Sequence, residues 1–451
     1  MRGTIRAFPV EYSCGSGATV RPARTRDDMK PIRALCRAAL FAFLALVCLS
    51  LANVALKSYD NYPKFKPFFS GGSAEYDAYF FGASNALNGI YPMQLWRDHA
   101  ITSYNFAWHK STIALDYWLL RLAARRHKPK IVFVDIFGMD GEQKIDQNLY
   151  YAHGALDLFP LSAEKLRAVA DLFGSSAERT EFVFPFYLYH SSWKTARADT
   201  MKAKAKTLLL ADGLLPTKGG ELRVGTAYPE HFNTAVRDFS AEETLSLRYA
   251  KKIVAYCKKN GIVPVFMLVP YPAQADMGEW KAFCVSALLQ EGADFLDMAD
   301  AVDFGTDKFD RFAHLNPSGA QKVTALVGAH IERTLGKPVA QKDGAVRAAW
   351  DADYAEYKRF YDGKITDEPL FSNTLTLLSN ADYRAEILRS GSAPLSETEK
   401  KLIGRLGGRV SVSVQKDAGH DIEMKIFTAA PESAGTPLCE KAFDRRTILL
   451  R

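Results

Sequence analysis

The sequence predicts an α/β fold in which helices cover both faces of a parallel sheet. Continuous apolar runs of strand length recur along the chain, most clearly KIVFVDIFG (Lys130–Gly138) and IVPVFMLVP (Ile262–Pro270). Such runs indicate strands that are buried on both faces. Amphipathic segments of helical length separate them, and this alternation is typical of a parallel sheet.

The elements of the predicted sheet domain, residues 77–340, follow a Pro/Gly-bearing linker at 57–76. The expected elements are strand 77–82, helix 92–98, strand 101–107, helix 111–128, strand 130–138, a helix opened by a Ser240/Glu243 capping box and closed at Gly261, strand 262–270, helix 277–289, strand 294–298 and helix 317–331. Residues 140–239 break this rhythm with helical pieces and aromatic clusters. We expect them to form an insertion over the carboxyl edge of the sheet, where open α/β folds place their ligands.

The character changes again near residue 341. The stretches 348–363 and 374–391 have helical patterns, whereas RVSVSVQ (409–415) and EMKIF (423–427) have strand patterns. Residues 341–451 are therefore predicted to be a small C-terminal α+β module.

Length and charge limit the function classes. The chain has 451 residues, 48% of them apolar, which is enough for one sizeable core and a second, smaller one. Residues 1–37 contain eight Lys or Arg and three Asp or Glu, so they carry +5 of the net charge of +7. The remaining chain is nearly neutral, and nucleic-acid binding has no electrostatic support.

The basic tail, residues 1–37, leads directly into AALFAFLALVCLSLANVAL, residues 38–56, which carry no charge. This is about the length that crosses a bilayer as a helix. The preceding basic residues put the N-terminus in the cytoplasm and the remainder outside. A cleaved signal peptide is the alternative, since Ala52 and Ala55 are small, although a strict A-x-A site is missing and the apolar run is long for a signal peptide. Translation could begin at Met1 or at Met29.

A serine follows the first predicted strand in the pattern Gly-Ala-Ser, with Ser84 before helix 92–98. Backbone N–H groups are unpaired where a helix begins, and such donors can hold an oxyanion. Ser84 could be a nucleophile, or it could be an ordinary turn or N-cap serine.

A histidine lies far downstream in FDRFAHLNPSGAQKVTALV, after strand 294–298 and before the helix that begins at Pro317. His314 and Ser84 therefore both belong to the carboxyl edge of the sheet. A serine needs a neighbouring base, and the base needs an orienting acid. Asp310 is four residues before His314 and can supply that acid. The alternative for His314 is a capping or loop histidine.

Four stretches, GASNALNGIYPMQLW, SYNFAWHKS, HKPKIVFVDIFG and HLNPSGAQK, together resemble the SGNH (GDSL-like) hydrolase superfamily. They look most like its membrane-anchored bacterial branch, similar to the D-alanyl transfer protein of teichoic acid modification and to alginate O-acetyltransferase-type proteins. The likeness covers about residues 70–335. It implies a three-layer, flavodoxin-like parallel sheet, with Ser84 as nucleophile, His314 as base and Asp310 as orienting acid. It also implies an oxyanion site made by the N–H groups of Ser84 or Asn85 and by Asn105.

Three departures from the family pattern leave alternatives open. The usual GDS is GAS, and the G-x-N-D block is Asp135–Gly138 without its asparagine. The acid usually stands three residues before the histidine, where this chain has Arg311, so Asp307 and Asp303 are fallback acids.

Candidates for substrate contact are His109, near the second strand, and three residues of the insertion, His153, His190 and Trp193. They could line a sugar or acyl pocket, or they could belong to a packed aromatic core or cap a loop. No HExxH, P-loop or Rossmann glycine motif occurs, so neither a metal nor a cofactor is expected.

Together these features predict a single-pass membrane protein with an extracytoplasmic serine acyltransferase or esterase domain. Its substrates would be acyl groups, O-acetyl or D-alanyl, on cell-envelope polysaccharide, and a multi-pass membrane O-acyltransferase would be its partner. The alternative is a non-catalytic glycan-binding or assembly protein of a polysaccharide biosynthesis complex.

Overall fold

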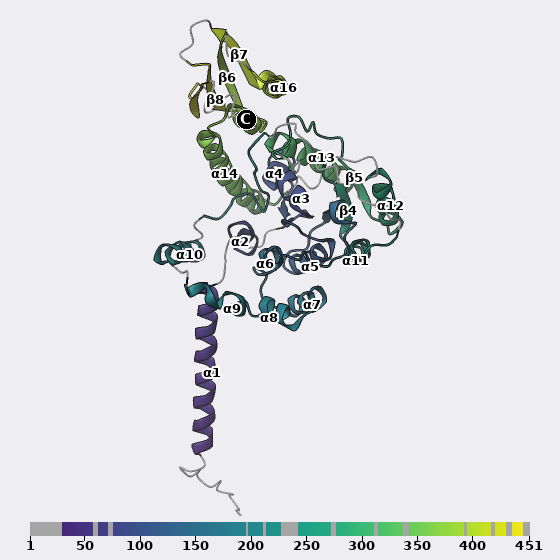
Figure 1. Cartoon of the computed structure of the whole chain (residues 1–451), viewed down its shortest axis with the longest axis vertical. Helices are drawn as coiled ribbons and strands as arrows, with labels where there is room; N and C mark the ends of the chain where they lie inside the picture. Colours follow the sequence, from purple (N-terminus) through teal and green to yellow (C-terminus); the bar gives the residue numbers. More distant parts are fainter. Residues whose placement is uncertain are drawn as a thin grey trace, which may run out of the picture. The chain divides into compact units, whose positions relative to one another are not determined.

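The computed structural model describes most of the chain (Figure 1). The described residues are 29–56, 62–70, 75–194, 197–210, 213–226, 242–271, 277–310, 314–336, 342–391, 395–415, 420–429 and 435–444. The chain divides into two compact units, Met1–Leu56 and Lys57–Arg451.

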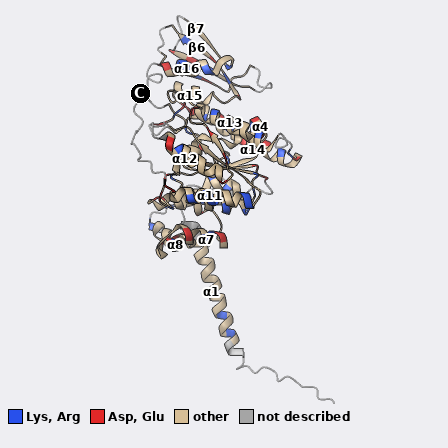
Figure 2. Ribbon diagram, turned by 90° about the vertical axis from the view of Figure 1, so that its right-hand side faces the viewer, with Lys and Arg blue, Asp and Glu red and all other residues tan. Residues whose placement is uncertain are grey.

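The first unit contains helix α1 (Met29–Leu56). Its segment Ile32–Ala52 is long and apolar enough to cross a membrane, and a signal sequence would have the same properties. Figure 2 shows the charged residues of α1 gathered toward its N-terminal end. The helix is therefore compatible with either prediction.

The second unit contains a five-stranded sheet in which every neighbouring pair is parallel. Its strands are β1 (Ala78–Phe81), β2 (Ser103–Asn105), β3 (Ile131–Asp135), β4 (Val263–Leu268) and β5 (Asp294–Asp297). Their order is β2-β1-β3-β4-β5, the order of flavodoxin-like doubly wound folds. The predicted parallel α/β sheet is confirmed.

Two groups of helices pack around this sheet. They are α5 (Ile113–Ala124), α11 (Leu245–Lys259) and α12 (Met277–Gln290) in one group, and α3 (Ser84–Gly89), α4 (Pro92–His99) and α13 (Pro317–Leu335) in the other. Figure 1 shows α11 and α13 on either side of β4. Helix α11 begins later than predicted, with Thr244 as its N-cap, and Ser240 of the expected capping box lies outside the described residues.

The stretch expected to be a linker contains helix α2 (Tyr62–Ser70). Its aromatic residues recur at helical spacing, and Phe65 and Phe68 are fully buried against Phe106. Pro63 lies in the first turn, where proline is tolerated, and Pro67 lies inside the helix. The prolines suggested a linker, but the buried aromatic face gives the segment a place in the core.

Short helices make up much of the described part of the insertion, whereas residues 213–226 contain no helix or strand. After η1 (Ile136–Gly138), which precedes the insertion, its helices are α6 (Leu149–Leu156), α7 (Ala163–Leu172), α8 (Ser176–Val183), α9 (Phe186–Tyr189), η2 (His190–Lys194) and α10 (Ala198–Leu210). The chain then returns to the sheet domain, where the backbone N–H of Glu221 donates to the carbonyl of Leu87 in α3.

The C-terminal residues add a second, mixed sheet of order β7-β6-β8-β9. The elements are α14 (Gly344–Asp367), α15 (Phe371–Leu377), β6 (Tyr383–Ser390), α16 (Glu397–Leu406), η4 (Gly407–Arg409), β7 (Val410–Gln415), β8 (Ile422–Thr428) and β9 (Cys439–Phe443). The helix expected over 374–391 is wrong in its second half. That part is β6, where buried and exposed residues alternate from Tyr383 to Ile387, which is the period of a strand.

Candidate active site

Strand β1 delivers Ser84 to the carboxyl edge of the sheet through a tight turn. Gly82 has φ +141°, and a Cβ there would lie 2.7 Å from Cβ of Asp135. Only glycine fits this turn. Ser84 is the first residue of α3, with Ala83 at the N-cap.

The structure brings Ser84, His314 and Asp310 together. Nε2 of His314 lies 2.8 Å from Oγ of Ser84, and Nδ1 of His314 lies 2.8 Å from Oδ2 of Asp310. The backbone N–H of His314 donates to the other carboxylate oxygen of Asp310 at 3.3 Å. Asp310 therefore contacts the imidazole from four residues away in the sequence, and all three side chains are partly exposed.

The described arms of the 307–316 loop, residues 307–310 and 314–316, carry Asp310 and His314 and pair with each other. The N–H of Asn316 donates to the carbonyl of Asp307 at 3.0 Å, and the N–H of Phe309 donates to the carbonyl of His314 at 2.6 Å. Asn316 also begins helix α13, where its Oδ1 accepts the N–H groups of residues 318 and 319. The start of α13 thus fixes one arm of the loop.

The two fallback acids have other partners. Asp307 is fully buried and pairs with Lys322 at 2.6 Å and with the hydroxyl of Ser318 at 2.9 Å. Asp303 pairs with Arg405 at 2.7 Å. Asp310 bonds His314 directly.

The predicted oxyanion donors differ in their availability. Ser84 and Asn85 lie in the first turn of α3, where backbone N–H groups have no intrahelical acceptor. The amide of Asn105, in contrast, donates to the carbonyls of Ala86 and Ile90 at 2.9 and 3.2 Å. Both of its donors are used to hold the end of α3, so the expected oxyanion role of Asn105 is replaced by a structural one.

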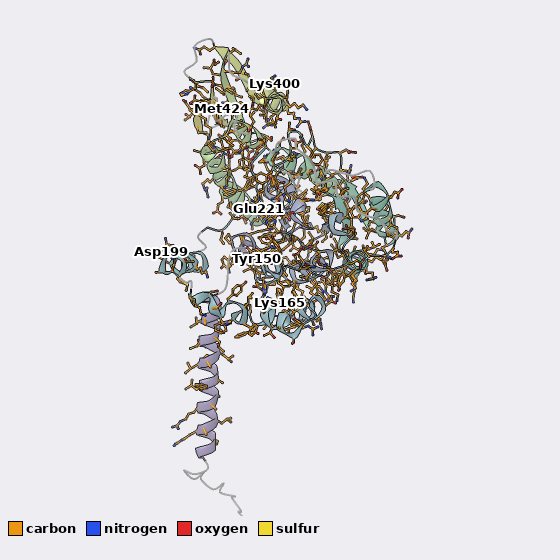
Figure 3. All side chains as sticks on the ribbon, viewed as in Figure 1. Tyr150, Lys165, Asp199, Glu221, Lys400 and Met424 are labelled. Carbon is orange, nitrogen blue, oxygen red and sulfur yellow. The ribbon has the colours of Figure 1, made fainter. Side chains whose placement is uncertain are left out.

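His109 lies close to the turn that carries Ser84, because the neighbouring N–H of Trp108 donates to the carbonyl of Gly82 at 3.0 Å. Nε2 of His109 lies 3.5 Å from a carboxylate oxygen of Glu221, which is labelled in Figure 3. Glu221 also pairs with Arg223 at 2.6 Å. Burial raises the pKa of Glu221, but the hydrogen bond from His109 and the charge of Arg223 outweigh it and lower the pKa.

Two candidates from the insertion, His153 and His190, have their described partners outside the Ser84 cluster. His153 is buried, stacks on Phe182 at 3.8 Å and bonds Asp157 at 3.1 Å. His190 is exposed, and its Nδ1 bonds the carbonyl of Tyr187 at 2.7 Å. The side chain of Trp193 lies outside the described residues. His153 thus belongs to a packed aromatic core, the alternative that its sequence context left open.

Two buried carboxyl groups beneath Gly82 were not anticipated. Asp116 of α5 accepts the hydroxyl of Ser111 at 2.5 Å, and Asp135, the last residue of β3, accepts the N–H of Val269 at 3.4 Å. Burial raises the pKa of each to about 7; for Asp116, hydrogen bonds from Ser111 and Gly82 oppose this and the nearby Asp135 adds to it. In the sequence, Asp135 stood out only as the first residue of the Asp135–Gly138 block, and Asp116 only as a charged residue within an apolar helical segment.

A cavity of about 360 Å³ opens next to Phe309 of the 307–316 loop. Its lining residues are Leu222, Arg223, Val224, Phe309, Lys364, Asp367 and Glu368. Among the described residues, no group of three or more His, Cys, Asp or Glu side chains is placed to hold a metal ion.

No protein family model matches the sequence, and no curated protein matches it significantly. Among solved structures, the chain is similar to a family two carbohydrate esterase from Clostridium thermocellum in complex with cellohexaose, at 9% identity, and to an active-site mutant of a family two carbohydrate esterase from the same organism, at 10% identity. Each match has a TM-score of 0.31 and covers 59% of this chain and 66% of the other. The matched part is thus slightly less than two thirds of each esterase chain.

Proposed function

We propose that this chain is an extracytoplasmic serine acyltransferase or esterase that acts on acyl groups, O-acetyl or D-alanyl, of cell-envelope polysaccharide. The observation that carries the proposal is the continuous hydrogen-bonded series from Ser84 through His314 to Asp310. This is the arrangement of nucleophile, base and orienting acid that serine acyl transfer requires. The resemblance to SGNH-like proteins supports the assignment.

In the first half-reaction, Oγ of Ser84 attacks the carbonyl carbon of the ester while Nε2 of His314 takes the hydroxyl proton. Asp310 stabilises the resulting imidazolium and holds its orientation. Backbone N–H groups of Ser84 and Asn85 are the donors proposed for the tetrahedral oxyanion. When the intermediate collapses, the ester C–O bond breaks and the leaving alkoxide takes the proton from His314, which leaves an acyl-serine.

In the second half-reaction, His314 removes a proton from the acceptor, whose oxygen attacks the acyl-serine. The bond between the acyl carbon and Oγ of Ser84 then breaks, and Oγ takes the proton back from His314. A glycan hydroxyl as acceptor makes the protein a transferase, and water makes it an esterase. Its resemblance to envelope-modifying proteins and the apolar helix α1 favour a glycan acceptor and a multi-pass membrane O-acyltransferase as the donor-side partner.

Labelling of the full chain in detergent with a serine-reactive fluorophosphonate tests the catalytic serine, with p-nitrophenyl acetate as a turnover substrate. Ser84→Ala is expected to abolish labelling, and His314→Ala to slow turnover by about 10³-fold or more, because a serine without its base is a weak nucleophile. Ser411→Ala, at an exposed position in β7, is the matched control and should behave as wild type.

Labelling that survives Ser84→Ala would place the nucleophile elsewhere. A folded wild-type chain that neither labels nor turns over the ester would contradict an active serine. Glycan binding that persists in such a chain would then favour the non-catalytic alternative.

A further inference from the structure

The C-terminal residues reach the loop region beside the candidate active site through helix α16. The guanidinium of Arg405 donates to Oδ2 of Asp303 at 2.7 Å and to Oδ1 of Asp307 at 3.2 Å, and it also donates to the hydroxyl of Thr306. At the other end of the same helix, the hydroxyl of Thr398 donates to the carbonyl of Gly305 at 3.2 Å. Both ends of α16 are thus attached to residues 303–307.

Asp307 is the centre of this attachment and is fully buried. Its carboxylate accepts hydrogen bonds from five donors: the N–H of Asp303, the hydroxyls of Thr306 and Ser318, the ammonium of Lys322 and the guanidinium of Arg405. A buried carboxylate costs several kcal/mol unless its charge and lone pairs are compensated. Arg405 is the one of these five donors that comes from the C-terminal residues.

Asp307 is also the first residue of the 307–316 loop. Its carbonyl accepts the N–H of Asn316, and the next residues pair across the loop up to the bond between Phe309 and His314. Paired backbone therefore links Asp307 to His314 and to Phe309, the residue before Asp310. Segments 303–307 and 397–406 are close in space although about a hundred residues separate them in the sequence.

We propose that Arg405 is a positioning residue, through which the C-terminal module holds the 307–316 loop in the register that aligns Asp310 and His314 with Ser84. Its catalytic consequence rests on the proposed function, whereas its effect on the loop does not. Reactions between fixed groups are sensitive to misplacement of about 1 Å, which can cost about 10²-fold in rate. The module is thus part of the working site and not only an appended domain.

The test compares Arg405→Ala, Arg405→Lys and Lys400→Ala in the full chain in detergent. Lys400, which is labelled in Figure 3, is the matched control because it lies on the same helix, is exposed and pairs with the exposed Glu397. Hydrogen exchange of the amides of Phe309 and Asn316, which close the loop, reports on the loop regardless of activity. Fluorophosphonate labelling and the separate kcat and KM for p-nitrophenyl acetate report on catalysis.

In Arg405→Ala, we expect exchange of these two amides to become about 10-fold faster, labelling to slow by about 10- to 100-fold and kcat to fall while KM stays within about twofold. Arg405→Lys should recover part of each loss, since it restores a cation without the forked donors. Lys400→Ala should leave all three measurements unchanged.

Loop exchange in folded Arg405→Ala that equals exchange in Lys400→Ala would overturn the proposal. Faster exchange throughout β6 and β8 as well as the loop would also overturn it, because Arg405 would then only stabilise the module. If Arg405→Ala does not fold, Arg405→Lys and Asp303→Asn, which removes the negative charge of one Arg405 partner, carry the same comparison. If wild type does not label, the proposed function fails and loop exchange still decides the role of Arg405.

Discussion

The carboxyl group of Asp135 sets a pH dependence at the level of one residue. It is fully buried beside Gly82, and burial raises its pKa from 3.8 to about 7. Between those values the folded chain binds more protons than the unfolded chain, so the free energy of unfolding falls as pH rises from about 4 to about 7 and then levels off. Asp116 has the same property.

We expect Asp135→Asn to raise the free energy of unfolding at pH 8 by roughly 2–4 kcal/mol, because one pKa unit corresponds to about 1.4 kcal/mol and the amide oxygen still accepts the N–H of Val269. The effect should be much smaller at pH 4. Urea unfolding at both pH values measures it, with Asp300→Asn as an exposed control. A variant that is less stable at pH 8 would show that the ionised carboxylate is required.

The residues of the candidate site illustrate what the sequence can predict at this scale. Ser84 and His314 were placed at one sheet edge because each follows a parallel strand, and the structure brings them within 2.8 Å. The sequence could not predict that the donors of Asn105 are used by two carbonyls of the neighbouring turn, or that His153 stacks in the core. Both facts depend on side-chain partners that lie outside any local pattern.

At the scale of elements, Asn316 joins a helix to the loop that carries the proposed base. Its Oδ1 caps α13, and its Nδ2 donates to the carbonyls of Gly225, Thr306 and Lys308. Asn316→Ala removes the cap and leaves buried carbonyls without a donor, so we expect a loss of roughly 2–4 kcal/mol of stability and slower labelling of Ser84.

Asn316→Asp separates these two roles, because the carboxylate still caps the helix but cannot donate. Urea unfolding should place it between wild type and Asn316→Ala. An aspartate variant as stable as wild type would show that the three carbonyl bonds contribute little.

The strands of the parallel sheet were predictable because continuous apolar runs leave few alternatives for residues 130–138 and 262–270. Residues 62–70 and 383–390 were misassigned for opposite reasons. In the first, prolines masked an aromatic helical face that only the core reveals. In the second, the alternation of buried and exposed residues in β6 is short and follows a helix, α15. The helix predicted from the sequence was therefore extended too far, into β6.

At the scale of the molecule, the C-terminal elements belong to the same compact unit as the parallel sheet. The indole of Trp350 in α14 packs on that of Trp96 in α4 at 5.5 Å, and Lys218 pairs with Asp353 at 2.5 Å. The sequence marked a change of character near residue 341, but contacts between residues so far apart have no local signal. They are consistent with a module that supports the site through Arg405.

The first compact unit contains α1, the apolar helix at 29–56. We expect α1 to remain on the mature chain as a membrane anchor, so N-terminal and C-terminal epitope tags should stay on one polypeptide of full length that carbonate washing does not extract. The double substitution Leu44→Arg and Leu46→Arg, within the apolar segment Ile32–Ala52, should release the chain from the membrane. Each arginine near the bilayer centre raises the free energy of membrane insertion by about 2.5–3.5 kcal/mol. Replacing the same leucines by isoleucine keeps the segment apolar and should leave the chain in the membrane. A shorter, extractable chain that carries only the C-terminal tag would instead identify the segment as a cleaved signal sequence, and the proposed enzyme would then act without an anchor of its own.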